Sequence, residues 1–105
     1  MDVTDSNFRE EVIEASKELP VLVDFWAPWC GPCQMLKPLM DKLTVDLDGK
    51  VKIVKVNVDE NKETAEQYDL MSIPCVKLFK KGKVEDEFLG LKSEEVVRGW
   101  IEERI

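Results

Sequence analysis

A short apolar run that leads into an amphipathic helical pattern limits this chain to few folds. Residues 21–26 (VLVDFW) are apolar apart from one aspartate, which is typical of a strand buried on both faces of a sheet. After the segment APWCGP, apolar residues recur at helical spacing as far as about residue 47, with Pro38 inside the pattern. A second buried-strand pattern follows at residues 51–58. This order of strand, helix and strand predicts a right-handed parallel crossover.

Near the N-terminus the sequence predicts another helix. Asn7 and Glu10 have the spacing of a capping box, although Asp5 or Ser6 could cap the helix instead. Pro20 ends this element. The apolar residues that recur there at helical spacing are Phe8, Val12, Ala15 and Leu19.

The second half of the chain predicts a β-hairpin between two helices. A short helix is expected at about residues 62–68, and strand patterns at 75–80 and 84–89 flank a Lys-Gly turn. Ser93 is the expected cap of a last helix. The buried face of that helix is predicted to contain Val96, Val97, Trp100 and Ile101. Together these elements predict one α/β domain over residues 1–105, a central mixed β-sheet flanked by helices on both faces.

Two cysteines, in the order Cys30-Gly31-Pro32-Cys33, lie between the first strand and its helix. Cys30 is therefore expected to be exposed, at or near a helix N-terminus. At this position free N–H groups and the helix dipole stabilise a thiolate. Cys33 lies about one turn further on, so the two sulfur atoms can approach each other, and Pro32 presets a helical φ. We predict a dithiol that attacks a disulfide and then resolves its own mixed disulfide.

Two other uses of a C-x-x-C motif are structural. A structural zinc ion normally needs four protein ligands, but this chain has no histidine and only one further cysteine, Cys75. A structural disulfide over so short a loop contributes only about 2 kcal/mol. Redox chemistry is therefore the favoured interpretation, and neither a metal site nor a cofactor is expected.

Charge and hydropathy exclude several partners. The net charge of −7, from 22 acidic and 15 basic residues, argues against binding to nucleic acid or to an anionic membrane surface. No apolar run approaches the length that crosses a bilayer, and the first residues lack the order of a signal peptide. We expect a soluble monomer in the cytoplasm, although a mature organellar protein would have the same pattern.

The segment WAPWCGPC, residues 26–33, resembles the active-site motif of the thioredoxin family. The similarity extends along nearly the whole chain and implies a thioredoxin fold. It also implies reduction of disulfides in protein substrates, with re-reduction by a thioredoxin reductase linked to NADPH or ferredoxin. In this family Cys30 attacks first and Cys33 resolves. The other residues that carry the resemblance are Asp24, Lys37 with Pro38, Lys55 with Asn57 and Asp59, Ser72-Ile73-Pro74, Phe79-Lys80-Lys81-Gly82, and Gly90.

Asp24 is the charged residue of the first strand pattern. Burial would raise its pKa towards the range of a general base, whereas an exposed acid at the strand end is the alternative. The resemblance implies that Asp24 accepts the proton of Cys33 through water. It also places Lys55 near Asp24, where a cation would moderate the pKa; an exposed lysine on an edge strand is the alternative.

The resemblance further implies a cis Ile73-Pro74 peptide bond and an apolar docking patch. The Ile73 backbone would pair with an extended substrate segment, and Pro74 would pack beside the cysteines. The patch would contain Trp29, Gly31, Pro32, Ile73 and Gly90. The alternative is that Trp29 and Ile73 are ordinary core residues.

The residues between the cysteines predict the direction of the redox reaction. Oxidising and isomerising relatives commonly carry histidine there, and its imidazolium would favour the reduced dithiol. Gly31-Pro32 supplies no such charge, so we expect a reductant.

Cys75 departs from the family pattern, because most thioredoxins have Thr after the cis proline. Strand alternation turns its side chain away from the active-site face, which predicts a buried, inert thiol. A regulatory thiol or a metal or iron–sulfur ligand is the alternative. Two alternative functions also remain open: binding through the docking patch without turnover, and electron donation to one particular enzyme.

Overall fold

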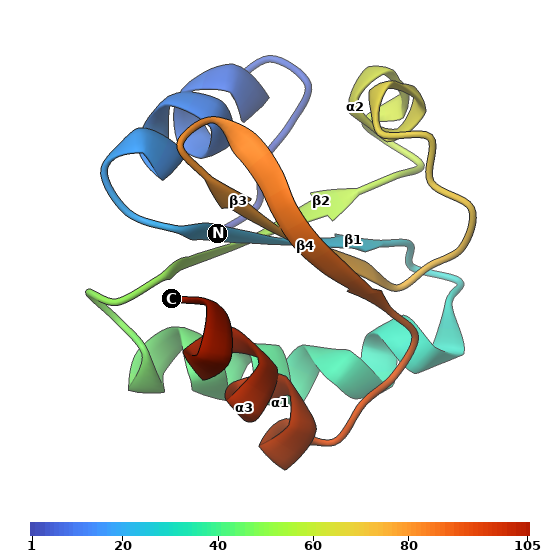
Figure 1. Ribbon diagram of the computed structural model, residues 1–105. Helices are drawn as coiled ribbons and strands as arrows, with labels where there is room; N and C mark the ends of the chain where they lie inside the picture. Colours follow the sequence, from blue (N-terminus) through green and yellow to red (C-terminus); the bar gives the residue numbers. More distant parts are fainter.

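The computed structural model describes residues 1–105. Its single sheet contains, in spatial order, β2 (Lys52–Asn57), β1 (Val21–Trp26), β3 (Cys75–Lys80) and β4 (Lys83–Leu89). β1 and β2 are parallel, whereas β3 pairs antiparallel with both β1 and β4. The predicted strand–helix–strand unit and hairpin are therefore confirmed (Figure 1).

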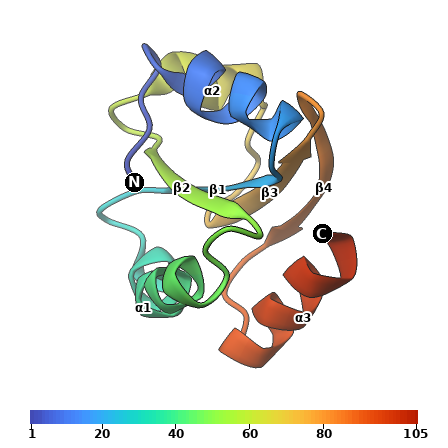
Figure 2. The ribbon, with the colours of Figure 1, turned by 90° about the vertical axis from the view of Figure 1, so that its left-hand side faces the viewer.

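Helices cover both faces of this sheet. α1 (Gly31–Asp46) and α3 (Glu94–Arg104) lie on one face, whereas α2 (Lys62–Gln67) and the N-terminal helical segment lie on the other (Figure 2). The predicted α/β architecture, a mixed sheet between two helical layers, is confirmed. No helix has the length and apolar character needed to cross a membrane.

The side chains of β1 alternate between the two faces of the sheet and contribute to the hydrophobic core on each face. Leu22 packs into the cluster formed with α1 and α3, whereas Val21, Val23 and Phe25 pack into the cluster on the opposite face. β1 is central in the sheet, so these residues are fully buried. The same alternation places Asp24 on the face of Leu22, the face that α1 covers.

The N-terminal helical segment is irregular. A π-helical turn, η1 (Arg9–Glu14), passes into a 3-10 turn, η2 (Ala15–Lys17). Of the four apolar residues that recur at helical spacing, Phe8 and Val12 are buried, whereas Ala15 and Leu19 are half-buried. Helical periodicity thus identified the buried face but did not reveal the type of helix.

The predicted capping box at the start of this segment is wrong. The Asn7 side chain accepts a hydrogen bond from the backbone N–H of Thr4 at 2.8 Å, and no side chain caps η1. Asp5 instead accepts hydrogen bonds from the backbone N–H and the hydroxyl of Thr64, at 2.9 and 2.6 Å. Asp5 therefore satisfies a donor in the first turn of α2, a long-range partner that local spacing cannot reveal.

The hairpin and the last helix follow their local signals. Lys81 and Gly82 have φ values of 55° and 82°, as a two-residue hairpin turn requires. Ser93 caps α3, because its Oγ accepts the N–H of Val96 at 3.3 Å. On α3, Val97, Ile101 and partly buried Trp100 face the sheet, but Val96 is 54% exposed, so its predicted burial is wrong. Val96 lies beside the apolar stripe rather than within it.

Candidate active site

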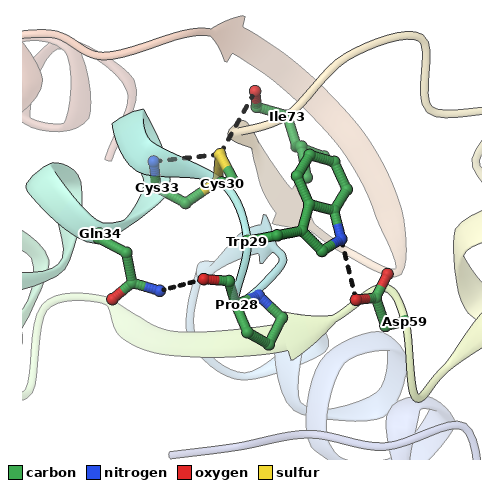
Figure 3. The surroundings of a disulfide bond; sticks show 7 residues. All are labelled: Pro28, Trp29, Cys30, Cys33, Gln34, Asp59 and Ile73. Atoms are coloured by element: carbon green, nitrogen blue, oxygen red, sulfur yellow. Dashed lines mark hydrogen bonds between the residues drawn. A yellow bond between two sulfur atoms is a disulfide. The ribbon is translucent and has the colours of Figure 1, made fainter.

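The two predicted cysteines lie at the junction of β1 and α1. Cys30 is the N-cap residue of α1 and forms a disulfide with Cys33, at a Cα–Cα separation of 5.2 Å. The backbone N–H of Cys33 donates to Cys30 Sγ over 3.2 Å, so this sulfur occupies the acceptor position of a helix cap (Figure 3). Helix N–H groups and the helix dipole therefore favour negative charge on Cys30 Sγ.

The expected exposure of Cys30 is wrong for the disulfide form. Cys30 is only 5% exposed and Cys33 only 2% exposed. Both pack in a small apolar cluster with Ala27, and Ile73 covers that cluster from a separate segment. Cys30 Sγ lies 3.9 Å from the carbonyl oxygen of Ile73. A reacting partner must therefore contact the residues around the disulfide in order to reach it.

Asp24 is buried, as predicted, and lies close to Cys33. It is 2% exposed, and no protein group hydrogen-bonds to its Oδ1. A small cavity of about 10 Å³, close to the volume that one water molecule requires, connects the two residues. The residues that line it are Asp24, Trp26, Cys33, Gln34, Lys37 and Lys55.

The environment of Asp24 gives it an unusual pKa. Burial in apolar surroundings raises the pKa of Asp24 to about 7, and the positive charge of Lys55 opposes part of this increase. The two residues are direct neighbours in the register of β1 and β2. Lys55 Nζ also lies 3.9 Å from Asp2 Oδ1 and 5.7 Å from the centroid of the Trp26 ring. The structure thus brings Lys55 to Asp24 and excludes a fully solvated lysine.

The predicted docking residues surround the cysteines. Trp29 is 71% exposed, so its interpretation as a core residue is wrong. Its indole N–H donates to Asp59 over 3.0 Å, which fixes the ring beside the disulfide (Figure 3). Ile73 is partly buried against the cysteine cluster, and the Ile73-Pro74 peptide bond is cis. Gly90 donates its N–H to the carbonyl of Pro74 at 2.9 Å.

The two residues between the cysteines complete the surroundings of the disulfide. Gly31 and Pro32 are both exposed at the start of α1. In the chain they directly follow Trp29-Cys30, and Trp29 is also exposed. Of the expected patch, Trp29, Gly31 and Pro32 thus adjoin the cysteines in the chain and Ile73 packs against them, whereas Gly90 is connected to them through Pro74.

The sequence analysis did not single out two neighbours of the candidate site. Asp59 was matched only as part of a family pattern, yet it holds Trp29 in place. Lys37 was matched only beside Pro38, yet it lines the Asp24 cavity. Lys37 follows Cys33 by four residues, one helical turn, so helical spacing could have revealed its position.

Cys75 lies on the opposite face of the sheet from the active-site cavity. It is 2% exposed and packs with the core under η1 and α2. Burial raises the pKa of the Cys75 thiol to about 11. The predicted burial and orientation are confirmed, whereas its chemical inertness remains a prediction.

Comparisons with known proteins find the same family over most or nearly all of the chain. A family model described as Thioredoxin matches residues 1–103. A Rickettsia conorii protein named Thioredoxin is 48% identical over 104 residues, which cover 99% of this chain and 97% of the relative. A Synechocystis protein with the same name is 52% identical over 88 residues, 84% of this chain and 80% of that protein. The match to the family model includes every site residue described above.

Proposed function

The chain belongs to the thioredoxin family and is a thiol–disulfide oxidoreductase, and on this basis we propose that it reduces disulfide bonds in protein substrates and is itself re-reduced by a thioredoxin reductase. The observation that carries the proposal is the Cys30–Cys33 disulfide at the N-terminus of α1. This position combines thiolate stabilisation at one sulfur with a second sulfur in bonding range.

In the first step of the proposed reaction, the thiolate of Cys30 attacks one sulfur of the substrate disulfide. A bond forms between Cys30 Sγ and that sulfur, and the substrate S–S bond breaks. The other substrate sulfur leaves as a thiolate and takes a proton from solvent. The donor to Cys30 Sγ, the N–H of Cys33 at 3.2 Å, supports Cys30 as the attacking residue.

In the second step, Cys33 resolves the mixed disulfide. Its thiol loses a proton to Asp24, and the resulting thiolate attacks Cys30 Sγ. The Cys30–Cys33 bond forms, the second substrate sulfur leaves, and two electrons have passed to the substrate. A pKa of about 7 and a cavity shared with Cys33 support Asp24 as the proton acceptor, directly or through one water molecule. Lys55 would keep the pKa of this carboxyl from rising further.

Substrate docking uses the surface around the disulfide. We assign it to Trp29, Gly31, Pro32, Ile73 and Gly90, with Pro74 beside the cysteines. Neither the N–H nor the carbonyl of Ile73 hydrogen-bonds to another backbone group. Both are therefore free to pair with an extended substrate segment, as in addition of a β-strand.

Regeneration of the dithiol requires two electrons from the reductase, which in turn takes them from NADPH or ferredoxin. We propose that the protein acts in the cytoplasm as a monomer of one domain. A radius of gyration of 12.4 Å supports a single domain, since about 13 Å is typical of a domain of this length. The pair Gly31-Pro32, which carries no charge, supports a reducing rather than an oxidising role.

Reduction of insulin disulfides with dithiothreitol as electron source tests this function. The wild type should show strong turnover, and Cys30→Ser should lose it. Cys75→Ser is the matched control and should retain it, because Cys75 lies on the other face of the sheet. Absence of turnover in the wild type would contradict the proposed function.

A further inference from the structure

The cavity beside Asp24 contains a polar group that the proposed mechanism does not use. Among the buried side-chain nitrogen and oxygen atoms of the protein, only Asp24 Oδ1 and Trp26 Nε1 have no hydrogen-bond partner. Both residues line the same cavity of about 10 Å³, and Cys33 lines it as well. The carboxylate oxygen is an acceptor, whereas the indole N–H is a donor only. The wall of this cavity thus contains one unused donor and one unused acceptor.

One water molecule satisfies both atoms. Nearly all buried polar groups in proteins have a hydrogen-bond partner, and a buried N–H without one is destabilising. Asp24 and Trp26 lie two residues apart on the same face of β1, so their Cα atoms are about 7 Å apart along the strand. Their side chains form no direct hydrogen bond with each other. The cavity between them has about the volume that one water molecule requires.

The other donors in the wall of the cavity have partners of their own. Lys37 Nζ donates to Asp41 at 2.8 Å, and the side-chain amide of Gln34 donates to a backbone carbonyl at 3.3 Å. Lys55 Nζ lies 3.9 Å from a carboxylate oxygen near the N-terminus. The indole N–H of Trp26 is therefore the donor of this wall that is available to a water molecule.

Packing holds the Trp26 ring in position. The ring packs against the apolar cluster that contains Cys30 and Cys33, and Lys55 Nζ lies 5.7 Å from its centroid, in the range of a cation–π contact. Trp26 as a whole is only half-buried, yet its Nε1 atom is buried. The N–H therefore stays in the interior beside Asp24, although no protein group binds it there.

We propose that Trp26 is a positioning residue for the resolving step: its indole N–H holds the water molecule through which the Cys33 thiol passes its proton to Asp24. The inference rests on the proposed function, in which Cys33 loses a proton before it attacks Cys30. The water accepts a hydrogen bond from Trp26 with one lone pair and takes the proton of Cys33 with the other. It gives one of its own protons to Asp24 Oδ1, so the water is regenerated and Cys33 becomes a thiolate.

A group that donates but cannot accept gives this transfer its direction. Because the indole N–H only donates, the water must turn a lone pair towards Trp26, which leaves its hydrogens for Asp24. A hydroxyl or an amide at the same position would also accept, and the water could then turn a hydrogen away from Asp24. Phenylalanine removes the N–H and keeps an aromatic ring in the strand. Trp26→Phe is therefore the variant that tests the role of this donor.

Heteronuclear NMR of the reduced wild type tests the water site. At about pH 8.5, above the pKa of Asp24 of about 7, no carboxyl proton contributes to the spectra. The Trp26 indole N–H should then show NOE and ROE cross-peaks to a long-lived water molecule. The Trp29 indole is the internal control, because it donates to Asp59 at 3.0 Å, and it should show at most exchange peaks, which have the opposite sign in ROE spectra. Absence of the water cross-peak at Trp26 would overturn the inference.

Stopped-flow kinetics with the aromatic disulfide dithiobisnitrobenzoate tests the role of the N–H. Attack by Cys30 releases a first coloured thiol at a rate proportional to the reagent concentration, and attack by Cys33 releases a second at a rate independent of it. Trp26→Phe should slow the second release about tenfold and change the first by about twofold or less. Trp100→Phe, which removes an indole of α3 outside the cavity, is the matched control and should retain both rates.

The outcomes separate this inference from the proposed function. An unchanged second release in Trp26→Phe would overturn the inference and leave the proposed function intact. Absence of the second release in the wild type would contradict the proposed function itself, because Cys33 would then not resolve the mixed disulfide. The NMR experiment uses the wild type, so it decides on the water site even where Trp26→Phe fails to fold.

Discussion

Replacing Asp24 by asparagine removes a buried carboxylate with little change in shape, and we expect it to stabilise the oxidised protein. Burial raises the pKa of Asp24 from 3.8 to about 7. Between these two pH values the native state therefore still holds a proton that the unfolded state has released. The native state is therefore destabilised as the pH rises from about 4 to 7. Below about pH 4 the Asp24 carboxyl is protonated in both the native and the unfolded state, so it no longer lowers the stability of the native state.

The magnitude follows from this difference in pKa. Each pH unit between 3.8 and about 7 costs the native wild type about 1.4 kcal/mol, which amounts to about 4 kcal/mol once the carboxyl is ionised in both states. Asparagine and protonated aspartate are both neutral and polar at this buried position. The variant should therefore match the wild type to within about 1 kcal/mol at pH 4 and exceed its stability by about 4 kcal/mol at pH 8.5.

Urea denaturation of the oxidised proteins, followed by circular dichroism between pH 4 and pH 9, measures this difference. Asp48→Asn, at an exposed position, is the matched control and should follow the wild type within about 0.5 kcal/mol. Parallel stability profiles for Asp24→Asn and the wild type across this range would refute the argument. The same variant should reduce insulin more slowly, because Cys33 would lose its proton acceptor.

Three further predictions follow from the structure. Because burial raises the pKa of Cys75 to about 11, iodoacetamide should label Cys75 in the native reduced protein roughly a hundredfold more slowly than in urea; equal rates would contradict an inert thiol. Ser93→Ala should lower the free energy of unfolding by about 1 kcal/mol in urea titrations, and no change would argue against its cap. Lys55→Met should raise the midpoint at which the Asp24 carboxyl titrates in NMR spectra, whereas an unchanged midpoint would exclude coupling between the two.

Elements of the fold with local signals were predictable from sequence. The apolar run of β1 and the helical spacing of α1 reflect burial within each element, and Lys81-Gly82 meets the φ requirement of its turn without help from distant residues. The capping box at Asn7 failed because the Asn7 side chain accepts the backbone N–H of Thr4 instead. Its neighbour Asp5 is held by Thr64, 59 residues away, and no local pattern encodes that contact.

The residues that form the site were predictable from sequence, but the burial of Cys30 was not. Spacing placed Cys30 and Cys33 at a helix start, and the apolar run of β1 indicated that Asp24 is buried. The burial of Cys30 depends on Ile73, which reaches the pair from a separate segment.

The measurement that tests the central mechanism most directly is capture of a mixed disulfide. The account predicts that Cys33→Ser, incubated with oxidised insulin, forms a stable adduct that peptide mapping by mass spectrometry locates at Cys30. Cys30→Ser under the same conditions should accumulate far less adduct. An adduct located mainly at Cys75, or equal capture by the two variants, would contradict the assignment of Cys30 as the attacking residue and Cys33 as the resolving one.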